Sequence, residues 1–111
     1  MSETKKSTTV VRYRVKPEHV DENERLSKAV YAELAEVRPA NLKYATWKLE
    51  DGVTFVHVAS ADIAEGEEFP LSSMPAFRAF RAGLDDRCDE GPIVSPSETV
   101  GVYDPAMYAV A

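Results

Sequence analysis

The sequence predicts an α+β domain with the element order β-α-β-β-α-β, in which a four-stranded antiparallel sheet carries two helices on one face. The central observation is the dipeptide Asp51-Gly52, which lies between two strand-like runs in residues 42–60. Asp-Gly in this setting is the strongest short-range signal for a β-hairpin. A strand-like run and a helical pattern precede the hairpin, and a second helical pattern and a strand-like run follow it.

The first part of the chain predicts a strand followed by a long helix. Residues 8–15 alternate between two faces and are rich in β-branched side chains, a pattern typical of a strand. Pro17 suits the first turn of a helix, where its missing N–H group is no loss. Apolar residues then recur at near-helical spacing for about five turns. The pair Arg38-Pro39 is expected to end this helix, because the residue before a proline avoids helical angles.

The hairpin has two alternative registers. A two-residue turn at Asp51-Gly52 pairs Trp47 with Val56. A three-residue loop, with Gly52 left-handed in a β-bulge, pairs Trp47 with Phe55 instead. The bulged register matches apolar residues with apolar ones, and such cross-strand pairs stabilise each other. We therefore predict the bulged register, which puts Trp47, Phe55 and His57 on one face of the sheet.

The second half of the chain predicts another helix and a final strand. Ser72 or Ser73 is expected to cap the helix, and Gly91-Pro92 is expected to end it. Residues 93–103 then form the last strand. Pro96 lacks an N–H group for the β-ladder, so the strand is expected to lie at an edge or to carry a bulge at Pro96. Right-handed crossovers independently put the first and third strands at the centre and the fourth at an edge, the ferredoxin-like arrangement.

The second strand of the hairpin predicts that both faces of the sheet are covered. Residues 53–59 are apolar at nearly every position, whereas a strand with a single buried face alternates more clearly. A second copy of the same sheet is the simplest cover, so we expect a homodimer through sheet-to-sheet packing. If Arg12 and Arg14 face the partner sheet, Glu98 is their natural ion-pair partner.

Length, charge and cysteine content limit the class of protein. The 111 residues fit one domain, with a core over residues 8–103 and an apolar tail, residues 104–111, of a kind that often docks on a neighbour. The net charge of −6 argues against nucleic-acid binding. No apolar stretch has the length of a membrane span or the position of a signal peptide. The single cysteine, Cys88, excludes an intrachain disulfide and fits a cytoplasmic location.

His57 is the main candidate for chemistry. It lies in the middle of an apolar strand, where desolvation would lower its pKa and leave a neutral imidazole able to take a proton near neutral pH. With Trp47 and Tyr13 nearby, such a base could deprotonate a phenolic substrate. The alternative is a core histidine that is hydrogen-bonded to a neighbour or fills the dimer interior.

Four aromatic residues are candidates for the wall of a ligand pocket: Trp47, Phe55, Phe77 and Phe80. Phe77 and Phe80 also have the spacing of helical core positions, so ordinary core packing is the alternative, and both can hold at once. We expect no metal site, because two histidines and one cysteine that lie far apart in the sequence are too few for a closed zinc site within one chain.

The element order and two segments, LEDGVTFVHV and MPAFRAFRAGLDDRC, resemble the antibiotic-biosynthesis-monooxygenase-like family of dimeric α+β barrels. The resemblance covers roughly residues 8–103. It implies two sheets packed into a barrel between subunits, and a pocket between sheet and helices in each subunit. Some members oxidise quinol-type polycyclic substrates without metal or flavin, related ones degrade haem, and many have no assigned activity.

The resemblance also suggests where the functional residues lie. Enzymes of the family commonly have an asparagine, a tryptophan and a histidine or arginine around the pocket, and Trp47 and His57 match two of these types. The haem-degrading relatives carry an asparagine on the first strand, but here Asn23 lies on the first helix and Asn41 precedes the second strand. This difference argues against haem degradation.

The resemblance therefore implies a small-molecule-binding homodimer that needs no cofactor. Its implied activity is cofactor-independent monooxygenation of an aromatic or quinol-type substrate, and the alternative is a non-catalytic ligand-binding or accessory dimer. In an enzyme, we expect His57 to act as the base and Trp47 and Tyr13 to orient the substrate. Phe77 and Phe80 would then form the pocket walls.

Overall fold

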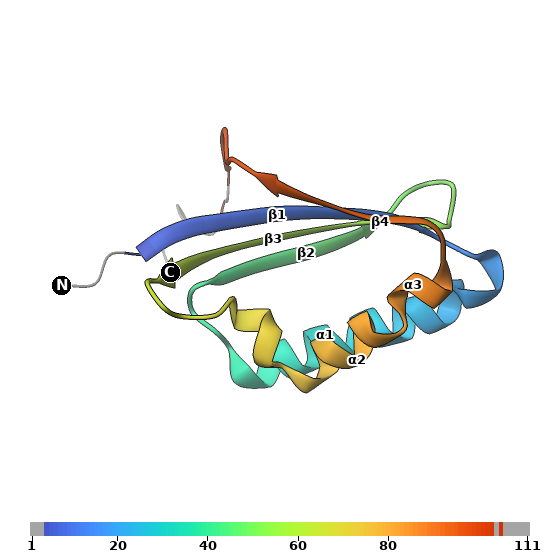
Figure 1. Ribbon diagram of the computed structural model, residues 1–111, viewed down its shortest axis with the longest axis horizontal. Coiled ribbons are helices and arrows are strands. Elements are labelled where there is room, and N and C mark those ends of the chain that lie inside the picture. Colours follow the sequence, from blue (N-terminus) through green and yellow to red (C-terminus); the bar gives the residue numbers. More distant parts are fainter. Residues whose placement is uncertain (1–3, 104, 106–111) are drawn as a thin grey trace.

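One antiparallel sheet of four strands carries all the helices on a single face (Figure 1). The computed structural model describes residues 4–103 and 105. The strands are β1 (Thr4–Val15), β2 (Leu42–Lys48), β3 (Thr54–Ala64) and β4 (Cys88–Ser97), in the order β2-β3-β1-β4. The helices are α1 (Val20–Val37), α2 (Pro75–Ala82) and α3 (Leu84–Arg87), with 3-10 turns η1 (Pro17–His19) and η2 (Pro70–Ser73). The predicted fold class and strand order are confirmed.

The first strand and helix follow the sequence pattern. β1 begins at Thr4 rather than at residue 8, and it pairs with β3 from Thr4 opposite Ala64 to Arg14 opposite Thr54. Helical structure begins at Pro17 as a 3-10 turn and continues as α1. Arg38 ends the helix in the left-handed region, with φ of 50°, as expected for a residue that cannot stay helical before a proline.

The predicted bulged register of the hairpin is wrong. Trp47 lies opposite Val56, and the Leu49 N–H donates to the Thr54 carbonyl at 2.8 Å. Asp51 explains this outcome, because its carboxylate accepts hydrogen bonds from the backbone N–H groups of Val53 (3.0 Å) and Thr54 (2.8 Å). These side-chain bonds close the loop locally. They outweigh the small gain from matching apolar residues across the strands.

The second helical segment is shorter than predicted. Ser72 and Ser73 belong to the 3-10 turn η2, and neither caps α2, which is preceded by Met74. The helical segment ends at Arg87, so Cys88 begins β4 instead of closing the helix.

Gly91 lies inside β4 and not before it. It adopts φ of +86° where the register between β1 and β4 shifts, and a Cβ there would lie 2.9 Å from the Arg12 carbonyl oxygen. The pair Gly91-Pro92 is therefore part of a bulged strand rather than a helix stop. The predicted edge position of Pro96 is confirmed, because Pro96 lies in the edge strand opposite Thr9.

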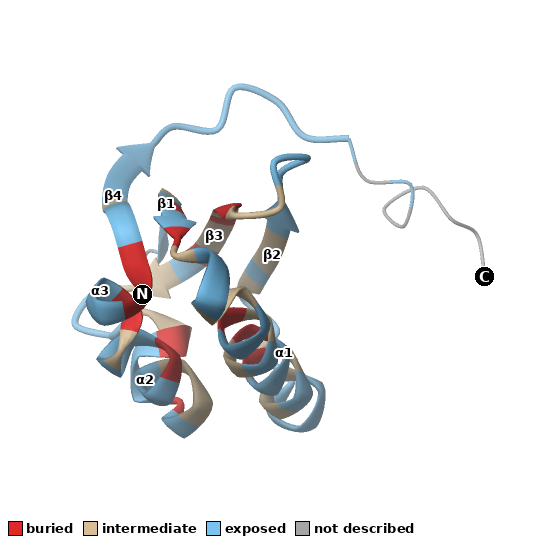
Figure 2. Cartoon of the chain, turned by 90° about the vertical axis from the view of Figure 1, so that its right-hand side faces the viewer, coloured by how far each residue is buried: buried red, intermediate tan, exposed pale blue. Residues whose placement is uncertain are grey.

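The core lies between the sheet and the helices, where the buried residues gather (Figure 2). It includes Tyr13, Val15, Phe55, Leu71 and Phe80. The opposite face of the sheet carries no helix among the described residues (Figure 1). The registers put an apolar group on this outer face, made of Val10, Ala45, Trp47, Val56, Val58 and Ile93.

Two further expectations concern charge and the tail. Arg14 has carboxylate partners in its own chain, since its Nε lies 2.8 Å from Asp89 and its Nη1 lies 3.5 Å from Glu90. The expected docking tail, residues 104–111, lies outside the described residues except for Pro105.

Within the part of the chain that the structure describes, no helix is both long enough and apolar enough to cross a membrane.

Candidate functional site

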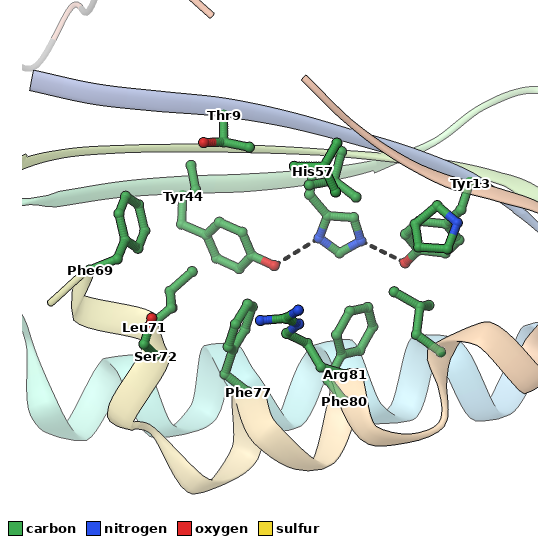
Figure 3. Close-up of a pocket in the computed structure, with 15 residues that line it drawn as sticks. Thr9, Tyr13, Tyr44, His57, Phe69, Leu71, Ser72, Phe77, Phe80 and Arg81 are labelled. Carbon is green, nitrogen blue, oxygen red and sulfur yellow. Dashed lines mark hydrogen bonds between the residues drawn. The ribbon is translucent and has the colours of Figure 1, made fainter. Parts of the chain in front are cut away.

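A cavity of about 260 Å³ lies between the sheet and α2. Its lining is mainly apolar and comes from every strand, with Val11 of β1, Ala59 of β3 and Val94 of β4 among the contributors. Phe77 and Phe80 form the helical side, and Figure 3 shows them facing Tyr44 and His57 on the sheet side. An apolar cavity with a few convergent polar groups is the usual form of a small-molecule site.

Strand alternation brings the polar groups of the cavity together. Tyr13 lies opposite Phe55 and Thr46 lies opposite His57, so all four side chains share the face that the helices cover. Tyr44 is two residues before Thr46 and therefore lies on the same face. The observed register is what puts His57 beside Tyr44 rather than beside Trp47.

His57 has hydrogen-bond partners at both ring nitrogens (Figure 3). Its Nε2 lies 2.6 Å from the Tyr13 hydroxyl. Its Nδ1 lies 2.7 Å from the Tyr44 hydroxyl and 2.9 Å from the Thr46 hydroxyl. The imidazole is buried, with 4% of the residue exposed, and its position is held from two sides.

The hydrogen bonds continue beyond Tyr13 to α1 and α3. Asn23 Nδ2 donates to the Tyr13 hydroxyl at 3.0 Å. Asn23 Oδ1 in turn accepts from Arg87 Nε at 3.1 Å, and Arg87 Nη2 donates to the Phe80 carbonyl at 2.8 Å. We call the chain Arg87–Asn23–Tyr13–His57–Tyr44 the polar relay.

Donors and acceptors in the polar relay define the histidine tautomer. The Tyr13 oxygen accepts from Asn23, so its own hydrogen needs an acceptor, and His57 Nε2 is the one available among the described residues. Nε2 is then unprotonated, and the neutral ring carries its hydrogen on Nδ1. That hydrogen points at Tyr44 and Thr46 as acceptors. The Tyr44 hydroxyl also has the neighbouring Thr46 hydroxyl as a side-chain hydrogen-bond partner.

Burial keeps the polar relay neutral around His57. Desolvation lowers the pKa of His57 to about 4, so the imidazole is uncharged at neutral pH. Burial also raises the pKa values of Tyr13 and Tyr44 well above the usual tyrosine range. Both phenols therefore keep their protons and act as hydrogen-bond donors.

Arg87 is an unusual member of the polar relay. Only 4% of the residue is exposed, and no carboxylate lies within ion-pair distance among residues 4–103. Its guanidinium carbon lies 5.2 Å from the Phe80 ring centroid. A buried cation is costly unless it is hydrogen-bonded, so the bonds to Asn23 and the Phe80 carbonyl are essential to its placement.

The structure brings together four of the six predicted site residues. Tyr13, His57, Phe77 and Phe80 line the cavity. Phe55 is buried behind them, stacked on Tyr13 with ring centroids 5.6 Å apart. Trp47 lies on the outer face and is 53% exposed, so it does not reach the cavity.

The sequence analysis did not assign Asn23, Tyr44 or Arg87 to the site, nor Arg81, which also lines the cavity. Asn23 had a readable signal, because it follows the helical spacing of the buried Ser27 and Val30 and so is a polar residue on a core-facing stripe. The position of Tyr44 beside His57 could be predicted only with the correct hairpin register. No group of three metal-binding side chains is found within the described residues.

Comparison with known proteins shows similarity in fold. No protein-family model matches the sequence, and neither does any curated protein. A crystal structure of an antibiotic biosynthesis monooxygenase matches with a TM-score of 0.59 at 16% identity, over 86% of this chain and 99% of that chain. Rv0793 from Mycobacterium tuberculosis matches with a TM-score of 0.66 at 13% identity, over 90% and 100%.

A conserved protein from Methanosarcina mazei Go1 matches with a TM-score of 0.63 at 18% identity, over 83% of this chain and 90% of that chain. The chain therefore resembles antibiotic-biosynthesis-monooxygenase-like structures, as the sequence predicted. At these identities the likeness concerns the fold.

Proposed function

We propose that this protein binds a small phenolic aromatic molecule in the cavity, with the aromatic rings against Phe77 and Phe80 and the hydroxyl group at Tyr44. The observation that carries this proposal is a cavity with aromatic walls that meets one end of the polar relay. The Tyr44 hydroxyl lines the cavity and supplies a donor for a phenolic oxygen. The cavity volume of about 260 Å³ suits two fused rings, since a cavity of about 150 Å³ encloses benzene.

Titration with 2-naphthol, followed by its fluorescence, tests this function. Tyr44→Phe removes the proposed donor and should weaken binding about five- to tenfold, the value of one net hydrogen bond. Ser97→Ala deletes a hydroxyl from an exposed position on β4, outside the cavity lining, and should leave the affinity unchanged. Equal affinities in Tyr44→Phe and the parent protein would argue against the proposed pose.

Cofactor-independent monooxygenation is the second candidate function. It is supported by the neutral His57, held inside an apolar cavity, and by the name of one fold neighbour, an antibiotic biosynthesis monooxygenase. In such a reaction, 1-naphthol and O₂ give 1,4-naphthoquinone and water. One oxygen atom enters the ring, and the other leaves as water with the two hydrogens that the substrate loses.

His57 would act as the base in this reaction through Tyr44. The phenolic proton passes to Tyr44 as the Tyr44 proton passes to Nδ1, which requires the tautomer with hydrogen on Nε2. That tautomer leaves the Tyr13 hydrogen without a described acceptor, which costs about 1–3 kcal/mol. The basic form is therefore a minor one, and Tyr13 controls how often it occurs.

The activity is tested by incubation with 1-naphthol under ¹⁸O₂ and mass analysis of the quinone. One labelled oxygen atom is expected, and His57→Ala should lower turnover about 100-fold or more, as for loss of a general base. A folded His57→Ala protein with parent turnover would contradict the catalytic role, while the binding proposal would stand.

We also propose that the outer face forms a homodimer. Trp47 and Ile93 are 53% and 58% exposed there, within an apolar group that no described helix covers. A stable interface of standard size buries about 800 Å² per partner. Sedimentation equilibrium should show a dimer that Trp47→Lys dissociates. Val37→Lys, which adds the same charge at another exposed apolar residue on α1, should leave the dimer intact.

A cytoplasmic location completes the proposal. Cys88 is the single cysteine of the sequence, and its thiol is free and buried. A structure that needs no disulfide is compatible with a reducing compartment.

A further inference from the structure

We infer that the ligand carries a carboxylate or a similar oxyanion, which Arg81 binds at the mouth of the cavity. This inference rests on the proposed binding of a phenolic aromatic and adds the ligand's second polar group. The implied ligand class is therefore a hydroxyaryl carboxylate, with its hydroxyl group deep in the cavity and its anion at the opening.

Arg81 is the charged side chain of the cavity wall. Among the described lining residues the others are apolar, hydroxylic, or the neutral His57. Figure 3 shows Arg81 extending from α2 toward the sheet, close to Phe77 and Phe80. Its guanidinium carbon lies 5.9 Å from the Phe77 ring centroid. A ligand stacked on these rings would therefore have a cation beside it.

The donors of Arg81 are available. No carboxylate lies within ion-pair distance of Arg81 among the described residues, and no hydrogen bond to another described group occupies its guanidinium. Arg14 and Lys48, by contrast, are paired with carboxylates. A guanidinium presents a planar fork of donors that matches a carboxylate in bidentate geometry.

A second hollow extends the binding surface outward from Arg81. Its lining is Ser72, Phe77, Arg78, Arg81 and Ala82, and three of these residues also line the main cavity. Arg78 is one helical turn from Arg81, and its Nε donates to the Ser72 carbonyl at 3.1 Å. That bond anchors Arg78 at the mouth and leaves its remaining donors free. Two cations therefore flank the opening in a protein whose net charge is −6.

The apolar cavity has a different polar group at each end, a neutral hydroxyl at one and a cation at the other. The inner end offers the neutral hydroxyl of Tyr44, held by His57. The outer end offers Arg81 beside Phe77. A neutral aromatic would leave the outer end unused, whereas a hydroxyaryl carboxylate satisfies both ends at once.

A matched pair of ligands tests the inference: 6-hydroxy-2-naphthoate and 6-hydroxy-2-naphthamide. They share the ring and the hydroxyl group and differ in charge. Isothermal titration should give about tenfold tighter binding of the naphthoate to the parent protein, a gain expected of charge-assisted hydrogen bonds. Arg81→Gln should remove this preference while leaving naphthamide binding unchanged, and Arg81→Lys should keep part of it. Arg25→Gln, which removes the same charge from an exposed position on α1, should keep the full preference.

The possible outcomes separate this inference from the function on which it rests. Equal binding of the two ligands by the parent protein, or a preference that survives in Arg81→Gln, would overturn the anion site and leave the aromatic pocket standing. An equal loss in Arg25→Gln would overturn it too, because overall charge would then explain the preference. Failure of both ligands to bind would overturn the aromatic-binding function itself.

Discussion

Asn23→Leu is the most informative single change to the polar relay. Asn23 is fully buried, and its side chain joins two partners from distant parts of the chain. Its Nδ2 donates to the Tyr13 hydroxyl at 3.0 Å, and its Oδ1 accepts from Arg87 Nε at 3.1 Å. Leucine has a similar shape and removes both bonds. The change therefore isolates the polar contribution of the side chain.

The expected loss follows from the two bonds. A hydrogen bond to a charged group contributes about 1.5–3 kcal/mol, and a neutral one contributes about 1 kcal/mol. Asn23→Leu should thus lower the free energy of unfolding by about 3 kcal/mol. That is a large share of the 5–15 kcal/mol typical of a domain. Urea denaturation of the parent and variant proteins measures the difference.

Asn41 offers a matched control. It is exposed, and its Nδ2 donates to the Asp62 carbonyl at 2.8 Å, so Asn41→Leu should cost under about 1 kcal/mol. Replacing both buried partners, in Asn23→Leu/Arg87→Met, should recover part of the loss because no unpaired cation remains. Stability of Asn23→Leu within about 0.5 kcal/mol of the parent would refute the reasoning.

Two other predictions concern His57 and the β4 bulge. Because the folded-state pKa of His57 is about 4 against 6.5 unfolded, the unfolded chain binds the proton first on acidification, and stability should fall by about 3 kcal/mol between pH 6.5 and 4. A His57 NMR resonance that titrates near pH 6.5 would contradict this. Gly91→Ala would place a Cβ 2.9 Å from the Arg12 carbonyl oxygen, on a residue whose φ is positive. It should lower the free energy of unfolding by about 1–3 kcal/mol, measured by thermal or urea denaturation. Gly101→Ala, which meets nothing within 4 Å, is the control, and equal effects of the two changes would count against the bulge argument.

Alternation and connection rules were sufficient to predict the architecture. Residues 8–15 alternate so clearly that Tyr13 could be assigned to one face, and it lies on that face in the structure. Pro96 and the right-handed crossovers independently indicated the edge strand. Such local patterns can be read from a single sequence, because the spacing of apolar residues follows the geometry of a strand or helix with one buried face.

The hairpin register could not be predicted in the same way. β3 is apolar on both faces, so a shift of one residue exchanges one apolar set for another and the hydrophobic pattern gives no penalty. The deciding interaction is the Asp51 carboxylate on the N–H groups of Val53 and Thr54. The predicted register wrongly placed Trp47 on the same face as His57 and concealed the role of Tyr44, whereas Trp47 lies on the outer face.

The contacts that join the rest of the polar relay were also beyond the sequence pattern. Asn23 and Arg87 are 64 residues apart along the chain, and nothing local indicates that they meet at Tyr13. The helical segment ends at Arg87, and the Arg87 side chain is buried. Contacts between distant elements depend on how the helices pack on the sheet, which residue spacing alone does not define.

A crystal structure of the protein with 2-naphthol bound tests the central claim most directly. We expect naphthol density between Phe77 and the sheet, with the naphthol oxygen within about 3 Å of the Tyr44 hydroxyl, the distance of a hydrogen bond. An empty cavity, or naphthol held against Trp47 on the outer face, would contradict it.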